Sequence, residues 1–403
     1  MLCVCAPQHQ MEGHSEGGGG GSPKFIMGLI ADIQYSTAPD ADFPSAVSGQ
    51  IAWALSNPSG SREWPLTYNW PSTRRYQHSL EVLRRALAFF SARRVGHAVV
   101  LGDLLDKTAI ARDEVDSCLR ALKAAFQGAA LRYHYLFGNG DAQCLKRAGW
   151  VAHGFAGPGC TAARLYYSAA PTPGLRLLFL DTFDVSAGQP ARPAPTSATP
   201  RQEVECEASS EEAHAAALAH LAANPLAAAP WGAATWREYP NRVPGHALEE
   251  AYASQAYNGG VGAAQMAWME GELAAAQAAG EAVFVFGHCP AHPWTAKPDG
   301  LMWRAAALRA ALERCPAVQA YIAGHDHDGG YFCSEAGVHY LVPPAPLESE
   351  EDNCFGALVF GEREWELEWH GKTPPAGCGT LRGGAWPSGR AMPYRALDGR
   401  GAQ

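Results

Sequence analysis

The sequence predicts an α/β fold, and three observations lead to this prediction. Short apolar runs alternate with stretches of helical periodicity from about residue 24 onward. The apolar runs are continuous rather than alternating, which is typical of strands buried on both faces of a sheet. Several of the runs end in a polar side chain, often after a glycine, as expected where strands of an α/β sheet form a site.

The apolar runs are each short enough to be one strand. We expect strands at 25–31, 97–102, 133–138, 175–180, 282–287 and 318–323. Two later runs, 338–342 and 356–360, predict further strands. Helical periodicity predicts helices at about 74–94, 112–127, 262–279 and 303–314.

One domain with added segments fits this chain of 403 residues better than two or three domains. Residues 1–23 are predicted to be a flexible Gly-rich leader, and residues 24–370 the domain itself. An insertion rich in Ala and Pro interrupts the domain at about 186–245, with an Ala-rich helix expected near 211–223. Residues 371–403, rich in Gly, Pro and Arg, are expected to be a C-terminal tail.

Composition excludes several kinds of partner. The formal charge is −9 and no basic face is evident, so a nucleic acid polymer is not expected as a partner. No apolar stretch is long enough to span a membrane and the N-terminus lacks a secretory signal, so we expect a cytoplasmic protein. The eleven cysteines are irregularly spaced without a CxxC pair, which favours reduced thiols over disulfides or a zinc site.

Polar side chains follow five of the predicted strands at the point where each strand ends. The sequences there are DIQ, GDLLD, GN, GH and GHDH, in chain order. Strand ends of an α/β sheet meet at one edge, so side chains from all five strands are expected to converge. The seven predicted metal ligands are Asp32, Gln34, Asp103, Asn139, His288, His325 and His327.

These residue types are chemically consistent with a pair of divalent ions. Oxygen and imidazole ligands without thiolate suit Mn²⁺, Fe²⁺ or Zn²⁺. Asp103 could bridge two ions about 3.5–4 Å apart. Two such ions carry four positive charges and the carboxylates of Asp32 and Asp103 remove two, so the surplus would attract a phosphate or diphosphate. Any one of these residues alone has an ordinary structural alternative; the ordered series of five strand ends favours the metal centre.

The motifs resemble those of the calcineurin-like metallophosphoesterase superfamily, whose series reads DxH, GDxxD, GNHE, a later GH, and GHxH. The resemblance covers most of residues 24–370. Within the superfamily, the chain is similar to the manganese-dependent ADP-ribose/CDP-alcohol diphosphatases. The stretches that carry this similarity are LIADIQY at 29–35, RRYQHSL at 74–80, LDTFDVS at 180–186, YNGG at 257–260 and AGHDHDGGY at 323–331.

The resemblance implies a metallophosphoesterase four-layer α/β/β/α sandwich and two divalent ions, with Mn²⁺ favoured over Mg²⁺, Fe²⁺ or Zn²⁺. It implies that a metal-bound hydroxide hydrolyses the phosphoanhydride bond of ADP-ribose, CDP-choline or a related nucleotide diphosphate. Carried over by position, one ion would bind Asp32, Gln34, Asp103 and His327, and the other Asp103, Asn139, His288 and His325. Gln34 stands where the family motif has His.

One departure from the family pattern concerns catalysis. Where the family reads GNHE, this chain has Gly140 in place of the histidine that contacts the phosphate or protonates the leaving group. Asp106, the second acid of GDxxD, would orient that histidine in the family. His292 is a candidate replacement for this proton donor. An ordinary solvated loop residue is an equally good interpretation of His292. A phosphate leaving group needs little protonation, so the loss of a general acid could cost less than the usual 10²–10⁴-fold.

Substrate contacts are predicted at two places. Arg74 and Arg75 could clamp a phosphate, with an exposed helix face as the alternative. Asn258, Gly259 and Gly260 could let the backbone approach the substrate just before a helix N-terminus that favours anions, with a simple turn as the alternative.

Three functions remain open from the sequence. The preferred one is a diphosphatase acting, as a monomer, on a small nucleotide diphosphate. The second keeps the metals but hydrolyses a phosphomonoester or a cyclic phosphodiester. The third is a metal-binding pseudoenzyme, indicated by Gly140, that binds a partner protein.

Overall fold

The computed structural model describes residues 25–43, 72–187, 208–224, 257–297, 300–351, 353–374 and 386–396. The predicted leader and most of the insertion lie outside these residues. Two six-stranded sheets form the centre of the fold.

The first sheet has the order β16-β15-β14-β1-β4-β5. Strands β1 (Phe25–Ile30), β4 (His97–Val100) and β5 (Arg132–Tyr135) run parallel to one another. Strands β14 (Cys354–Phe360), β15 (Glu364–Gly371) and β16 (Ala391–Pro393) extend the sheet in antiparallel fashion from β1.

The second sheet has the order β12-β13-β11-β10-β7-β6. Its four central strands are parallel: β13 (His339–Val342), β11 (Val318–Ile322), β10 (Ala282–Phe286) and β7 (Leu175–Phe179). Antiparallel strands β12 (Gly330–Cys333) and β6 (Tyr167–Thr172) form its two edges.

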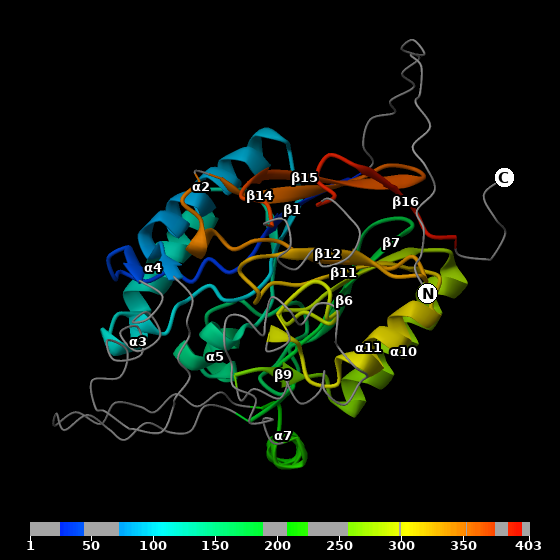
Figure 1. Cartoon of the computed structure of the whole chain (residues 1–403), viewed down its shortest axis with the longest axis horizontal. Helices are drawn as coiled ribbons and strands as arrows, with labels where there is room; N and C mark the ends of the chain where they lie inside the picture. The colour runs from blue at the N-terminus through cyan, green and yellow to red at the C-terminus, as the bar shows by residue number, and fades with distance from the viewer. Residues whose placement is uncertain are drawn as a thin grey trace, which may run out of the picture.

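Helices cover the outer face of each sheet, which completes four layers (Figure 1). The helices α2 (Tyr76–Ala92) and α4 (Val115–Gln127) lie on the side of the first sheet. The helices α10 (Ala263–Ala279) and α11 (Ala305–Arg314) lie on the side of the second. Shorter elements are β2 (Ala41–Phe43), β3 (Ser72–Arg74), α3 (Thr108–Ala111), α5 (Asn139–Cys144), α6 (Arg147–Ala152), β8 (Val185–Ser186), β9 (Gly259–Gly260) and η3 (Pro346–Glu348).

Aromatic side chains join the inner faces of the two sheets. Phe284 of β10 packs edge-on against Phe360 of β14 and Trp365 of β15, with ring centroids 4.9 and 5.2 Å apart. His134 of β5 stacks on Phe179 of β7 with centroids 4.5 Å apart. Both sheets are therefore buried on both faces, which explains why the strands in their centre are continuously apolar.

Every apolar run predicted to be a strand forms a strand, and every predicted helix forms a helix. The observed ends lie within a few residues of the predicted ones. The Ala-rich helix in the insertion is α7 (Glu211–Ala223). The domain extends past residue 370: β16 pairs with β15, and Arg395 donates hydrogen bonds to the carbonyl oxygens of Cys315 and Glu313 at the end of α11. Among the described helices, none is long and apolar enough to cross a bilayer.

Candidate metal centre

Strand ends from both sheets deliver acidic and histidine side chains to one buried place. Asp32 follows β1 and Asp103 follows β4, while His288 follows β10 of the other sheet. One ligand atom of each lies within 4.8 Å of the others, and all three residues are almost fully buried. The two sheets thus build a cluster suited to a metal ion where the strand ends predict one.

Contacts around Asp103 divide the predicted ligands into two groups. Oδ2 of Asp103 accepts a hydrogen bond of 2.7 Å from Nε2 of Gln34, which also lies 3.1 Å from Nε2 of His327. Oδ1 of Asp103 lies 3.5 Å from Nε2 of His288. That His288 nitrogen lies 3.2 Å from Oδ1 of Asn139. Each oxygen of Asp103 therefore faces a different group of ligands.

Asp32 is held by the opposite sheet. The backbone N–H of His325 donates to both carboxylate oxygens of Asp32 at 3.0 Å, and Oδ1 lies 3.8 Å from Nε2 of His327. Burial raises the pKa of Asp32 well above its usual range, and the neighbouring charge of Asp103 raises it further, against the lowering effect of the His325 N–H. A cation between the two carboxylates would relieve this repulsion.

Backbone strain is concentrated at the ligands. Asp32, Gln34, Asp103 and His325 have φ values of 43°, 42°, 50° and 70°, in a region that L-residues seldom adopt. In the described part of the chain, only three other non-glycine residues have positive φ: Arg94, Asp113 and Arg304. Such strain persists where the surrounding structure fixes it, and it clusters at functional sites.

Gly138 gives the Asp103 carboxylate its place. A Cβ at Gly138 would lie 2.1 Å from Oδ1 of Asp103 and 2.5 Å from its backbone nitrogen. The φ of Gly138 is −104°, which any residue adopts. The glycine before Asn139 is therefore required for its close approach to Asp103, and not for a positive φ.

Each predicted histidine ligand has a partner that orients its ring. Nδ1 of His288 lies 2.7 Å from the carbonyl oxygen of Leu101. A carbonyl oxygen only accepts, so Nδ1 carries the proton and Nε2 presents its lone pair toward Asp103 and Asn139. Burial lowers the pKa of His288, which keeps the ring neutral.

Asn258 orients His325. Its Oδ1 lies 2.8 Å from Nε2 of His325, and its Nδ2 donates a 2.9 Å hydrogen bond to the carbonyl oxygen of Leu301. Because Leu301 can only accept, Oδ1 must face His325, so Nε2 of that ring carries the proton and Nδ1 has the lone pair. The side chain of Asn258 thus supports a predicted ligand, and its place near substrate stays a prediction.

Glu348 orients His327. Its Oε1 lies 3.1 Å from Nδ1 of His327, which leaves Nε2 of the ring facing Gln34 and Asp32. Burial alone would raise the pKa of Glu348, but the charge of Arg74 and the hydrogen bond with His327 outweigh it and hold this pKa below its usual range. A carboxylate hydrogen-bonded to the far nitrogen of a ligating histidine is a common arrangement at metal sites.

The donor set fits divalent ions. Nε2 of Gln34 lies beside Oδ2 of Asp103 and Nε2 of His327. Turning the amide by 180° would present Oε1 to the same place. With carboxylate, amide and neutral imidazole donors and no thiolate, the site suits Mn²⁺ and similar ions.

Gly140 lies too close to its neighbours to carry a side chain. Its N–H donates a 2.7 Å hydrogen bond to Oδ1 of Asp103, and a Cβ would lie 2.5 Å from the carbonyl oxygen of Leu105. The next residue, Asp141, is fully buried and accepts hydrogen bonds from the N–H groups of Leu104, Leu105 and Gly138. This segment therefore holds the loop that carries Asp103.

The two acid–base candidates, Asp106 and His292, make contacts with other groups than the predicted metal ligands. Oδ1 of Asp106 accepts a 2.7 Å hydrogen bond from the N–H of Thr108 at the start of α3. His292 is buried, stacks on Phe332 with centroids 4.2 Å apart, and accepts from the N–H of Trp294. Burial lowers the pKa of His292 to about 3, so the ring lacks the proton that a general acid needs at neutral pH. This geometry argues against His292 as the replacement donor.

The two arginines have different surroundings. Nη1 of Arg74 lies 3.4 Å from Oε1 of Gln34, and Nη2 lies 3.4 Å from Oε1 of Glu348, so its guanidinium is beside the predicted ligands. Arg75 forms an ion pair with the exposed Glu350.

The glycine pair and the helix after it have structural partners. Gly259 and Gly260 pair with β8, and the carbonyl oxygen of Gly259 accepts from Trp303. At the start of α10, Oδ2 of Asp184 accepts a 3.0 Å hydrogen bond from Gly262. The anion at this helix N-terminus is thus the Asp184 carboxylate, which reduces the case for a substrate phosphate there.

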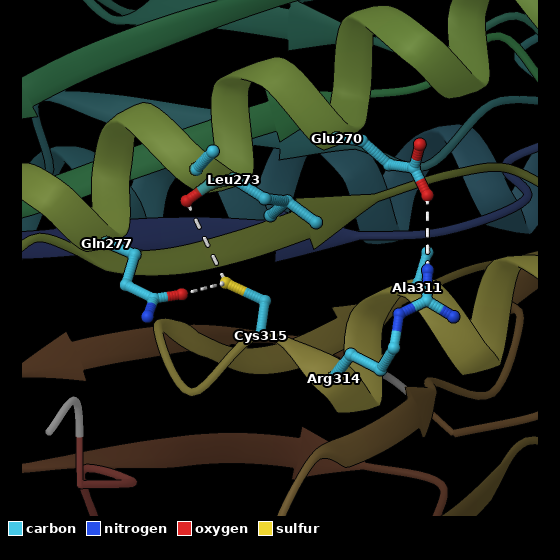
Figure 2. Close-up of a pocket in the computed structure, with 7 residues that line it drawn as sticks. Glu270, Leu273, Gln277, Ala311, Arg314 and Cys315 are labelled. Atoms are coloured by element: carbon cyan, nitrogen blue, oxygen red, sulfur yellow. Dashed lines mark hydrogen bonds and ion pairs between the residues drawn. The ribbon is translucent and has the colours of Figure 1, made fainter.

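A surface groove of about 220 Å³ lies between α10 and α11 (Figure 2). An ion pair of 3.2 Å between Arg314 and Glu270 crosses it, and the thiol of Cys315 points at Leu273 and Gln277 of α10. None of the residues that line this groove is a predicted ligand. It is separate from the metal centre.

Known proteins are similar to this chain over most of its length. A manganese-dependent ADP-ribose/CDP-alcohol diphosphatase of Danio rerio is 25% identical over 368 residues, which cover 87% of this chain and 96% of the relative. One of Oryza sativa is 25% identical over 343 residues, covering 85% and 88%. A crystal structure of a dimetal phosphatase from Danio rerio superposes with a TM-score of 0.69 at 22% identity, covering 93% of this chain and 100% of that one.

The chain has the metallophosphoesterase fold. The four-layer sandwich and the resemblance to the manganese-dependent diphosphatases, both predicted from the motifs, are confirmed. No family model matches the sequence. In this metallophosphoesterase fold, the strand-end motifs predict the cluster of Asp32, Asp103 and His288. Asp141 and Glu348 were not identified from the sequence as residues that support it. Only the position of Asp141 after the GNG sequence pointed to it; Glu348 lies among several acids and nothing in its pattern marks it.

Proposed function

We propose that this chain is a metal-dependent hydrolase that cleaves the phosphoanhydride bond of small nucleoside diphosphate-linked molecules, such as ADP-ribose and CDP-alcohols. The observation that carries the proposal is the position of Asp103, whose two oxygens face two different groups of ligands. This arrangement supports a bridging role between two ions. The diphosphatase names of the curated relatives, which align over most of this chain, support the substrate class.

The contacts agree with the division of ligands that the family resemblance implies. Gln34, His327 and Asp32 would hold one ion with Asp103. Asn139 and His288 would hold the other, together with His325, whose ring centroid lies 5.0 Å from that of His288. When bound, two divalent ions, with Mn²⁺ favoured, would activate water and neutralise charge that develops on the diphosphate. The chain's own part is to fix the ligands by the strained backbone and the oriented histidines, and to offer Arg74 as a phosphate contact.

A substrate panel tests the proposal. Purified full-length protein is assayed with Mn²⁺ on ADP-ribose, CDP-choline, a cyclic nucleotide and a phosphomonoester. We expect hydrolysis of the two diphosphates, its loss in Asp103→Ala, and its retention in the control Glu270→Gln, an exposed acid on α10. Preference for the cyclic nucleotide or the monoester would contradict the substrate class.

Gly140 favours a second reading, in which the protein binds metal without turnover. The position that carries the family histidine lacks a side chain here, and Gly140 is packed against Leu105. Two bound Mn²⁺ ions with no hydrolysis of any substrate in the panel would support this reading over the first.

A further inference from the structure

We propose that Glu348 is a positioning residue that holds a metal ligand, His327, and a phosphate contact, Arg74, at the same time. Its Oε1 lies 3.1 Å from Nδ1 of His327 and 3.4 Å from Nη2 of Arg74. The inference rests on the proposed function and extends it: filling the ion site of His327 and binding the substrate phosphate would depend on the same carboxylate.

The segment that carries Glu348 is fixed on both sides. Leu347 is fully buried, and its carbonyl oxygen accepts a 2.7 Å hydrogen bond from the N–H of Arg75. The N–H of Ala345 donates a 3.1 Å hydrogen bond to the carbonyl oxygen of His327. Lys372 donates to the carbonyl oxygens of both His327 and Glu348, at 3.4 and 3.2 Å. The carboxylate therefore has a set position relative to the ring that it orients.

Each of the two contacts has its own chemical consequence. The hydrogen bond to Nδ1 fixes the tautomer of His327, so that Nε2 keeps its lone pair for the ion, and it makes the ring a stronger ligand. The ion pair holds the guanidinium of Arg74 beside Oε1 of Gln34, at 3.4 Å. A guanidinium suits a phosphate because its planar donors match two oxygens at once.

Two substitutions separate these consequences. Glu348→Ala removes both contacts, whereas Glu348→Gln keeps an oxygen that can accept from His327 but loses the charge that holds Arg74. Arg74→Gln removes the guanidinium and its contacts with Glu348 and Gln34, but it leaves the Glu348 carboxylate beside His327. Glu351→Ala is the matched control, because Glu351 is an exposed acid three residues further along the same segment.

The primary measurement is Mn²⁺ affinity without substrate, from the electron paramagnetic resonance signal of free Mn²⁺ during titration of the full-length protein. We expect Glu348→Ala to weaken the affinity for one of two Mn²⁺ ions by about 10–100-fold, the usual effect of losing the hydrogen-bond partner of a ligating histidine. Glu351→Ala should leave both affinities at the wild-type value, and Arg74→Gln should weaken Mn²⁺ binding less than Glu348→Ala does, because it keeps the carboxylate beside His327. Glu348→Ala with two wild-type affinities would overturn the proposal.

The second measurement is KM for ADP-ribose at saturating Mn²⁺. Glu348→Gln and Arg74→Gln should both raise KM about 10-fold or more while Glu351→Ala leaves it unchanged, since a charged hydrogen bond contributes about 1.5–3 kcal/mol. An unchanged KM in Glu348→Gln would contradict the link to Arg74. If the wild type binds Mn²⁺ but hydrolyses no diphosphate, the proposed function fails, and the affinity series still decides whether Glu348 positions His327.

Discussion

Asn258 accepts a 2.8 Å hydrogen bond from Nε2 of His325, and its own amide nitrogen is fixed by the carbonyl oxygen of Leu301. This pair connects the loop before α10 with the strand end after β11. We therefore expect Asn258→Ala to let the His325 ring rotate and to weaken the affinity for one Mn²⁺ ion by about 10–100-fold. Calorimetric titration with Mn²⁺ checks this, with Gln277→Ala as control, because Gln277 lines the groove between α10 and α11 and not the metal centre. Equal affinities in Asn258→Ala and wild type would refute the role of Asn258.

The close packing of Gly140 means that adding a single methyl group there should lower the free energy of unfolding. In Gly140→Ala the new Cβ would meet the carbonyl oxygen of Leu105 at 2.5 Å, so the backbone must move, at a cost of about 1–3 kcal/mol. Gly271, in the middle of α10, has open space, so Gly271→Ala should stabilise the protein by about 0.5–1 kcal/mol. Urea denaturation followed by circular dichroism measures both. A Gly140→Ala variant as stable as the wild type would show that the loop tolerates a side chain there.

The buried His292 should make the free energy of unfolding depend on pH. Burial lowers its pKa from the usual 6.5 to about 3, so between these values the unfolded chain binds a proton that the folded chain does not. The stabilising contribution is complete above pH 6.5 and is lost as the pH falls toward 3. Between pH 7 and pH 5 this group alone should cost about 2 kcal/mol.

Substituting His292→Gln should remove that part of the pH dependence. Unfolding free energies from urea titrations at pH 7 and pH 5 give the comparison, and His214→Gln, an exposed position on α7, is the control. The same His292→Gln protein should keep its turnover per folded molecule at pH 7, because a neutral ring cannot donate as a general acid. A large loss of kcat in His292→Gln would restore His292 as a catalytic candidate.

The sequence predicts the centre of this fold well because the central strands are buried on both faces. Such strands appear as continuous apolar runs, and β1, β4, β7, β10 and β11 were all found this way. Strand β15 was missed although its sequence alternates, with Trp365, Leu367 and Trp369 buried between polar residues. The short strand β16 has no pattern of its own and forms because the edge of β15 is free to pair with it.

The candidate metal centre could be located for a similar reason. Its predicted ligands follow the apolar strands directly, so the cluster of Asp32, Asp103 and His288 can be found by the place of these residues in the chain. The residues that orient those ligands cannot. Glu348 lies 21 residues from His327 in sequence, and Asn258 lies 67 residues from His325, so only the folded chain brings each pair together.

We expect Asp103 to lie between two ions, one on each of its carboxylate oxygens. A crystal structure of the protein grown with Mn²⁺, with data collected at a wavelength where manganese scatters anomalously, tests it directly. We expect two anomalous peaks about 3.5–4 Å apart, with Gln34 and His327 beside one and Asn139 and His288 beside the other. A single peak, or two peaks that share no contact with Asp103, would contradict a bridging role for Asp103.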